Sequence, residues 1–86
     1  MAKRERAGEF VVKEVVHAVP CREGEELRFQ KVEVNGAERA DVRYFARSDY
    51  SGGKFMQTPR GITIDPSRLS SVVEGVQKLA AKFAKK

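Results

Sequence analysis

Basic side chains and aromatic rings alternate through the middle of the sequence, and together they suit contact with an unpaired nucleic acid. The cations are Arg28, Lys31, Arg39, Arg43, Arg47, Lys54 and Arg60, and the rings are Phe29, Tyr44, Phe45, Tyr50 and Phe55. Cations pair with phosphates, and each base stacked on a ring contributes about 1–3 kcal/mol. A duplex hides its base faces, so the combination favours single strands. The ordinary alternative is that the rings fill a core and the arginines lie on a solvated sheet face.

The sharpest part of this pattern is the alternation of Arg43, Phe45 and Arg47. In a strand, residues two apart point to the same face. We therefore expect these three side chains to share one face of a sheet.

Catalytic and metal-binding residue patterns have little support. His17 is the single histidine and Cys21 the single cysteine, and no nucleophile is spaced to pair with either. A structural zinc site needs four ligands, and one cysteine cannot close a disulfide within the chain. The sequence thus predicts no enzyme, no cofactor and no metal. The lone cysteine and the lack of a secretory leader favour a cytoplasmic location.

Size and charge fit a small binding domain with an anionic partner. The chain has 86 residues and a formal net charge of +5, from 17 basic and 12 acidic side chains. This length fits one domain with a thin core. Residues 1–8 read as a flexible basic tail, and residues 9–84 as the domain. No apolar run approaches the roughly 18 residues that span a bilayer, so no membrane partner is predicted.

Four strands are predicted, and they precede a helix. Their ranges are 9–19, 26–35, 40–48 and 54–64. The first strand carries valines in both phases, so both of its faces are partly apolar. The apolar phase changes near Gln30 and Lys31, which predicts a β-bulge in the second strand. The dipeptide Asn35-Gly36 predicts a hairpin turn, because both residues tolerate positive φ.

A long amphipathic helix follows the fourth strand. Asp65 is a good N-cap and Pro66 a good first helical residue. Apolar side chains then recur within one arc of about 120°. The predicted core or dimer residues on this arc are Leu69, Val72, Val73, Val76, Leu79 and Phe83.

The fold class is therefore α+β: a curved four-stranded antiparallel sheet followed by one C-terminal helix. One helix covers one face of such a sheet, and the other face must meet solvent, a ligand or a second subunit. Apolar residues on both faces of the first strand argue against solvent alone.

Residues 41–69 resemble the DNA-binding domain of the transcriptional positive cofactor 4 family, including its short bacterial members. Three pieces carry the resemblance, and they are Asp41-Val42-Arg43 followed by Tyr44-Phe45, then Arg60-Gly61-Ile62-Thr63-Ile64, then Asp65-Pro66 opening the helix. A weaker match covers Glu26 to Gly36. The family's pattern departs at Val34, Ala46 and Pro59, and the sequence has no tryptophan.

The resemblance implies a homodimer whose curved sheets form grooves for single-stranded DNA. It places Arg43 and Arg60 at basic positions of the binding surface and Phe45 at a frequently aromatic one. Strand geometry adds Arg39, Arg47 and Lys54 to the predicted contacts, and the basic–aromatic pattern adds Arg28 and Lys31. The acidic, serine-rich regulatory region of eukaryotic members is absent, so coactivator activity is not carried over.

The leading functional prediction is a sequence-independent single-stranded-DNA binder that serves transcription regulation, replication or repair. RNA binding on the same face stays open, because stacking and phosphate contacts suit both nucleic acids. A protein-interaction module whose open sheet binds another protein is the alternative from a different class.

Overall fold

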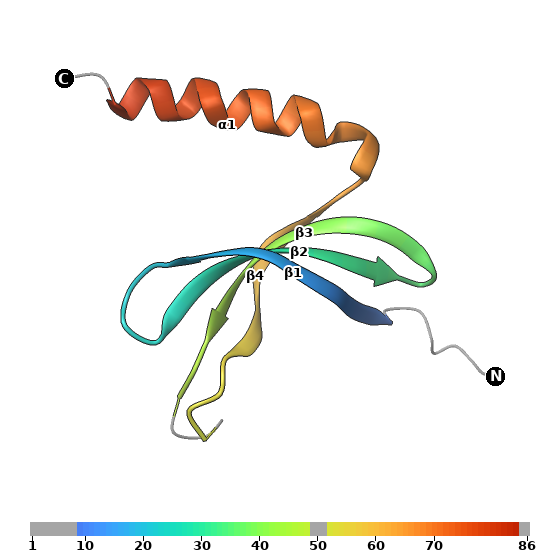
Figure 1. Ribbon diagram of the computed structural model, residues 1–86, viewed down its shortest axis with the longest axis vertical. Helices are drawn as coiled ribbons and strands as arrows, with labels where there is room; N and C mark the ends of the chain where they lie inside the picture. The colour runs from blue at the N-terminus through green and yellow to red at the C-terminus, as the bar shows by residue number, and fades with distance from the viewer. Residues whose placement is uncertain (1–8, 49–51, 85–86) are drawn as a thin grey trace.

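The computed structural model describes residues 9–48 and 52–84 and has four antiparallel strands followed by a helix (Figure 1). The strands are β1 (Phe10–Pro20), β2 (Glu25–Val34), β3 (Ala37–Ala46) and β4 (Met56–Ile64). They pair in chain order, β1-β2-β3-β4. The predicted α+β class is thus confirmed. The predicted tail 1–8 and the aromatic Tyr50 lie outside the described residues.

The β2–β3 hairpin follows the sequence prediction closely. Val34 pairs with Ala37, and Asn35 and Gly36 between them have φ of 53° and 86°. Both values lie in the left-handed region that a tight two-residue hairpin turn requires. This turn sets the register along the whole of β2 and β3, which pair without a break.

The predicted bulge in the second strand is wrong. The register shifts occur in β1 instead, between Val12 and Glu14 and between Val15 and His17, opposite Lys31 and Gln30. The phase change in β2 has another cause. Because both faces of the sheet carry apolar side chains, β2 supplies Phe29 to one face and Val32 to the other without interrupting its ladder.

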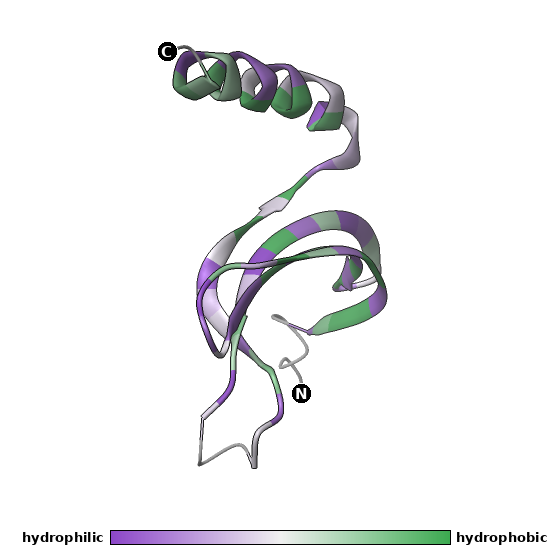
Figure 2. Cartoon of the chain, turned by 60° about the vertical axis from the view of Figure 1, so that its left-hand side comes forward, coloured by the Kyte–Doolittle hydropathy of each residue, from purple (hydrophilic) through white to green (hydrophobic). Residues whose placement is uncertain are grey.

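The sheet is strongly curled (Figures 1 and 2). Most of its buried residues lie on one face. Gln30 pairs with Asp41 and Val32 with Arg39, so these side chains share a face, and Phe45 shares it by alternation. We call this the inner face. Its buried members are Gln30, Val32, Asp41 and Phe45. The opposite, outer face carries Leu27, Phe29, Val42 and Tyr44, which are half-buried.

The chain leaves the sheet through a capped helical segment. Asp65 accepts a hydrogen bond from the backbone N–H of Ser67, and a 3₁₀ turn, η3 (Pro66–Arg68), leads into α1 (Leu69–Ala84). The predicted cap and helix are therefore present. The hydrogen bonds to Asp65 from the backbone and the hydroxyl of Ser67 lower the pKa of its carboxyl.

The expectation that the helix covers one face of its own sheet is wrong. In Figures 1 and 2, α1 extends away from the sheet, and none of its residues is buried. Val76 is 58 %, Leu79 59 % and Phe83 76 % exposed. At the start of the helix, Leu69 lines the same cavity as Ala40 of β3. The curl of the sheet buries its own inner face, so burial there does not require the helix.

Candidate nucleic-acid interface

A buried polar network, which we call the Asp41 network, occupies the middle of the inner face. The Asp41 side chain is 0 % exposed and accepts both a 3.0 Å bond from Arg43 Nε and a 2.9 Å bond from Arg43 Nη2. Gln30 Nε2 and Thr63 Oγ1 donate to the same carboxylate at 3.0 and 2.9 Å. This two-pronged pairing is the strong form of a charge-assisted hydrogen bond. Arg43 therefore makes its strong hydrogen bonds within the protein.

The electrostatics of this network favour the ionised carboxylate. Burial alone raises the pKa of Asp41, but hydrogen bonds from Arg43, Gln30 and Thr63 outweigh it, and the Arg43 charge adds to them. The pKa of Asp41 is consequently lowered. Arg43 also donates from Nη1 to the Thr58 carbonyl at 3.1 Å, which joins β3 to β4. The network therefore ties the middle of the sheet together.

Beyond this network, the inner face ends in a guanidinium over a phenyl ring. The Arg28 guanidinium carbon lies 4.2 Å from the centre of the Phe45 ring, and Arg28 Nε donates to the Glu26 carboxylate. We call Glu26, Arg28 and Phe45 the Phe45 triad. Phe45 itself is 7 % exposed. Its ring is thus covered by Arg28 and is not presented to solvent as an open stacking surface.

Phe55 extends this cluster toward the β3–β4 loop. The Arg28 guanidinium lies 5.5 Å and the Arg47 guanidinium 5.2 Å from the centre of the Phe55 ring. Arg47 is held nearby, because its backbone N–H donates to the carbonyl of Gly24. Two arginines therefore flank one half-buried ring. Lys54 precedes that ring and is exposed.

A second triad lies on the outer face at the same end of the sheet. The Arg60 guanidinium carbon lies 4.4 Å from the centre of the Tyr44 ring, and Arg60 Nη2 donates to the Glu25 carboxylate. We call Glu25, Arg60 and Tyr44 the Tyr44 triad. Tyr44 and Phe45 are neighbours in β3 and so point to opposite faces. Glu25 and Glu26 do the same in β2.

The structure does not gather all of the predicted site residues. Arg28, Phe45 and Arg47 come together at one end of the sheet, whereas Arg60 lies across the sheet from Phe45. The implied single open face bearing Arg43, Phe45 and Arg60 is therefore wrong. Arg43 and Phe45 are largely buried. Arg60 lies over Tyr44, which strand alternation places on the other face. Whether these side chains contact nucleic acid stays a prediction.

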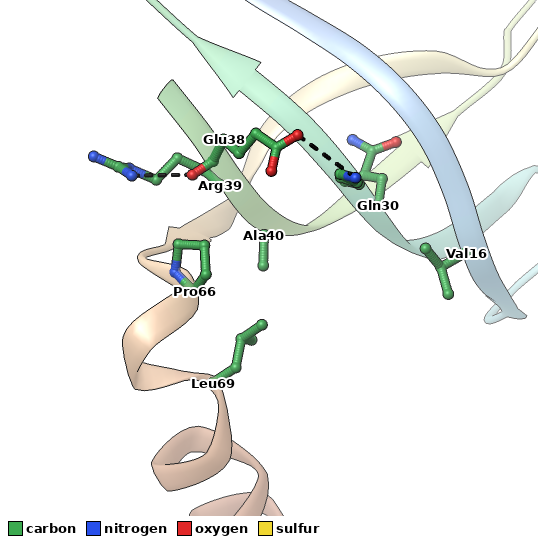
Figure 3. Close-up of a pocket in the computed structure, with 8 residues that line it drawn as sticks. Val16, Gln30, Glu38, Arg39, Ala40, Pro66 and Leu69 are labelled. Atoms are coloured by element: carbon green, nitrogen blue, oxygen red, sulfur yellow. Dashed lines mark hydrogen bonds and ion pairs between the residues drawn. The ribbon is translucent and has the colours of Figure 1, made fainter. Parts of the chain in front are cut away.

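Two further predicted cations lie away from the triads. Arg39 is opposite Val32 and donates to the carbonyl of Glu38 at 3.0 Å. Lys31 lies 3.5 Å from Glu38 in an exposed ion pair. Both residues line a cavity of about 310 Å³ at the root of the helix. Figure 3 shows Arg39 beside it and Ala40 pointing toward Leu69. This cavity is mainly apolar, and none of the six triad residues lines it.

Sequence reasoning underused two kinds of residue. Tyr44 and Phe55 were predicted as candidate stacking rings but were not assigned as binding contacts, and the structure places Arg60 over Tyr44 and Arg47 near Phe55. Asp41 was part of the family resemblance without an assigned role. The spacing of Asp41 and Arg43, two apart in a strand, was the signal that could have revealed their pairing.

The described residues provide neither a metal cluster nor a membrane span. Within residues 9–48 and 52–84, no three His, Cys, Asp or Glu side chains gather closely enough to hold a metal ion. No helix in the same part of the chain is long and apolar enough to cross a bilayer.

A curled four-stranded antiparallel sheet followed by an outlying helix defines a PC4-like fold, and comparison with solved structures confirms it. The chain is similar to a PC4 homologue from Burkholderia pseudomallei, BPSL1147, known in two crystal forms. The orthorhombic form gives a TM-score of 0.71 at 24 % identity, over 81 % of this chain and 90 % of that one. The tetragonal form gives 0.68 at 25 %, over 78 % and 96 %.

These matches confirm the resemblance noted in the sequence at the level of the fold. A scan against protein-family models finds no match, and neither does a search of curated proteins. The likeness therefore rests on backbone arrangement more than on shared residues.

Proposed function

We propose that this protein is a homodimer that binds single-stranded DNA, largely without regard to sequence, during transcription, replication or repair. One observation carries the proposal: a PC4-like sheet ends in arginines that lie over aromatic rings, Arg28 over Phe45 and Arg60 over Tyr44. Guanidinium groups bind phosphates, and they also stack on unpaired bases. No catalytic step is proposed, and we propose a cytoplasmic location.

The charge at this end of the sheet suits a phosphate backbone. Arg28, Arg47, Lys54 and Arg60 lie there on or beside adjacent strands, against the carboxylates Glu25 and Glu26. Arg60 is 57 % exposed, so phosphate reaches it without rearrangement of the sheet. The single strand would follow the end of the sheet where β2 begins and β3 ends, opposite the Asn35-Gly36 turn, with one triad on each face.

The dimer is proposed from the exposed apolar stripe of α1. Val73, Val76, Leu79 and Phe83 are each at least half exposed within one chain. Contiguous exposed apolar patches of this kind mark interaction sites. A second copy offers the same stripe, so a two-fold contact between helices buries both at once.

Fluorescence anisotropy with labelled oligo-dT, a matched duplex and oligo-U of equal length tests the proposal. We expect oligo-dT to bind more tightly than the duplex at low salt. Equal affinity for oligo-dT and duplex, or no binding at low salt, would contradict it. Tighter binding of oligo-U would assign the same surface to RNA instead.

The salt dependence locates the contacts. On a single strand, log affinity falls against log salt by about 0.7 for each phosphate neutralised. Arg28→Ala and Arg60→Ala should each lower that slope by about this amount. Arg68→Ala, at the root of the helix, is the matched control and should leave the slope unchanged. Slopes unchanged in all three variants would remove the triads from the site.

A further inference from the structure

The two triads are built in the same way: in each, the guanidinium lies over the ring, so a ligand meets the guanidinium first. In each triad a glutamate of β2 holds an arginine, and that arginine lies over an aromatic residue of β3. Glu25 and Glu26 are adjacent, as are Tyr44 and Phe45. The arrangement on the inner face is thus repeated on the outer face.

Burial decides which group a base can reach. A base stacked on Phe45 would have to take the place of Arg28, because the Arg28 guanidinium carbon lies 4.2 Å from the Phe45 ring centre and Phe45 is only 7 % exposed. Displacing Arg28 would break its bond to Glu26 and its contact with Phe55. The Arg28 side chain is 24 % exposed and the Arg60 side chain 57 % exposed, so both arginines already reach the surface. A planar guanidinium stacks on bases as an aromatic ring does.

Resting on the proposed function, we propose that Arg28 and Arg60 are the base-stacking groups of this protein, with the rings of Phe45 and Tyr44 serving as their supports. Glu26 and Glu25 are positioning residues, since each fixes one edge of a guanidinium and leaves its other N–H groups for phosphate. Each triad then stacks on one unpaired base of any identity, because every base has a π-face.

Lysine variants test the stacking, because lysine keeps the charge but has no plane to stack. Binding of labelled oligo-dT is compared with binding of an abasic deoxyribose-phosphate oligomer of equal length. Wild-type protein should prefer oligo-dT. Arg28→Lys and Arg60→Lys should each weaken oligo-dT binding about five-fold or more, with little change for the abasic oligomer and an unchanged salt slope. Arg68→Lys, exposed in η3, is the matched control and should bind both probes as wild type does.

Glutamate variants separate positioning from simple repulsion. Glu26→Ala should raise affinity for the abasic oligomer, because a negative charge is removed, while lowering the preference for oligo-dT over it. Glu26→Gln keeps an acceptor oxygen and should restore that preference. A purely structural role would weaken binding of both probes together, which would overturn the positioning role.

The results of these binding experiments distinguish failure of the base-stacking inference from failure of the proposed function. Failure to bind oligo-dT at low salt rejects the proposed function itself. Equal wild-type binding of oligo-dT and the abasic oligomer leaves single-strand binding intact but overturns base stacking, as does full oligo-dT affinity in both lysine variants. Circular dichroism checks the fold of each variant; if Arg28→Lys is unfolded, Arg60→Lys, altered at an exposed residue, decides the question.

Discussion

The sheet and helix α1 differ in where their apolar side chains find neighbours. On the inner face of the sheet, Val32 is fully buried and Phe45 nearly so. Along α1 no residue is buried, although the apolar side chains follow one stripe. Within the described residues, the sheet therefore buries the apolar side chains of its inner face by curling, whereas the apolar stripe of α1 stays exposed. The contacts of the sheet hold the fold, and the stripe is the surface proposed above for a second copy.

The largest expected effect comes from placing a charge on the helix stripe. Leu79→Asp should convert the proposed dimer to monomer, because an apolar side chain contributes about 1.5–3 kcal/mol when buried and a two-fold contact loses it twice. We expect the dimer dissociation constant to rise about 100-fold or more, measured by sedimentation equilibrium. Ser71→Asp adds the same charge away from the stripe and should leave the dimer intact. A Leu79→Asp protein that remains dimeric would move the interface off α1.

The sheet should respond to loss of its own buried pair. Asp41→Ala leaves the largely buried Arg43 without its carboxylate, and breaking a buried pair in this way costs about 3–5 kcal/mol. Urea unfolding measures the loss. Glu38→Ala removes an exposed pair with Lys31 and should cost less than about 1 kcal/mol. Similar costs for both variants would mean that the Asp41 network does not hold the sheet.

Local sequence signals predicted the elements well, because their causes are local. Asn35 and Gly36 specify a turn through positive φ, and Asp65 with Pro66 specifies a helix start. The apolar spacing from Leu69 to Phe83 specifies an amphipathic helix. Each of these is decided within a few residues, so the sequence alone carries the information.

The candidate site was less predictable, because it depends on pairing across strands. Alternation correctly placed Arg43 and Phe45 on one face, but it said nothing of how tightly the sheet curls. The curl seals Phe45 under Arg28. The position of Arg60 over Tyr44 depends on the register between β3 and β4, which shifts between Arg43 and Phe45. No short motif reports such a shift.

A glycine in the sheet should resist substitution. A Cβ added at Gly61 would lie 2.7 Å from the Val42 carbonyl oxygen and 2.8 Å from Arg43 Cα. Both are backbone atoms, so the β3–β4 pair must move apart. Gly61→Ala should therefore destabilise the protein by about 1–3 kcal/mol in thermal or urea unfolding. Wild-type stability in this variant would show that the two strands yield without cost.

Acid should weaken the sheet through Asp41. Its folded pKa lies below the ordinary value of 3.8, so the ionised form stabilises the fold fully above that value. This contribution is lost as pH falls below 3.8 toward the folded pKa. The free energy of unfolding, measured from about pH 6 to about pH 2.5, should fall less steeply at its acid end in Asp41→Asn than in wild type. Parallel curves would assign the acid loss to other carboxylates.

The smallest change in stability is expected at Gly75, the glycine of the helix. Its sign is opposite to that expected at Gly61. A Cβ added at Gly75 meets nothing within 4 Å in the described chain. Alanine is favoured over glycine inside a helix by about 0.5–1 kcal/mol. Gly75→Ala should therefore stabilise the protein by about this amount and leave its dimer dissociation constant unchanged. Weaker dimerisation would instead place Gly75 against the partner helix and widen the interface beyond the apolar stripe.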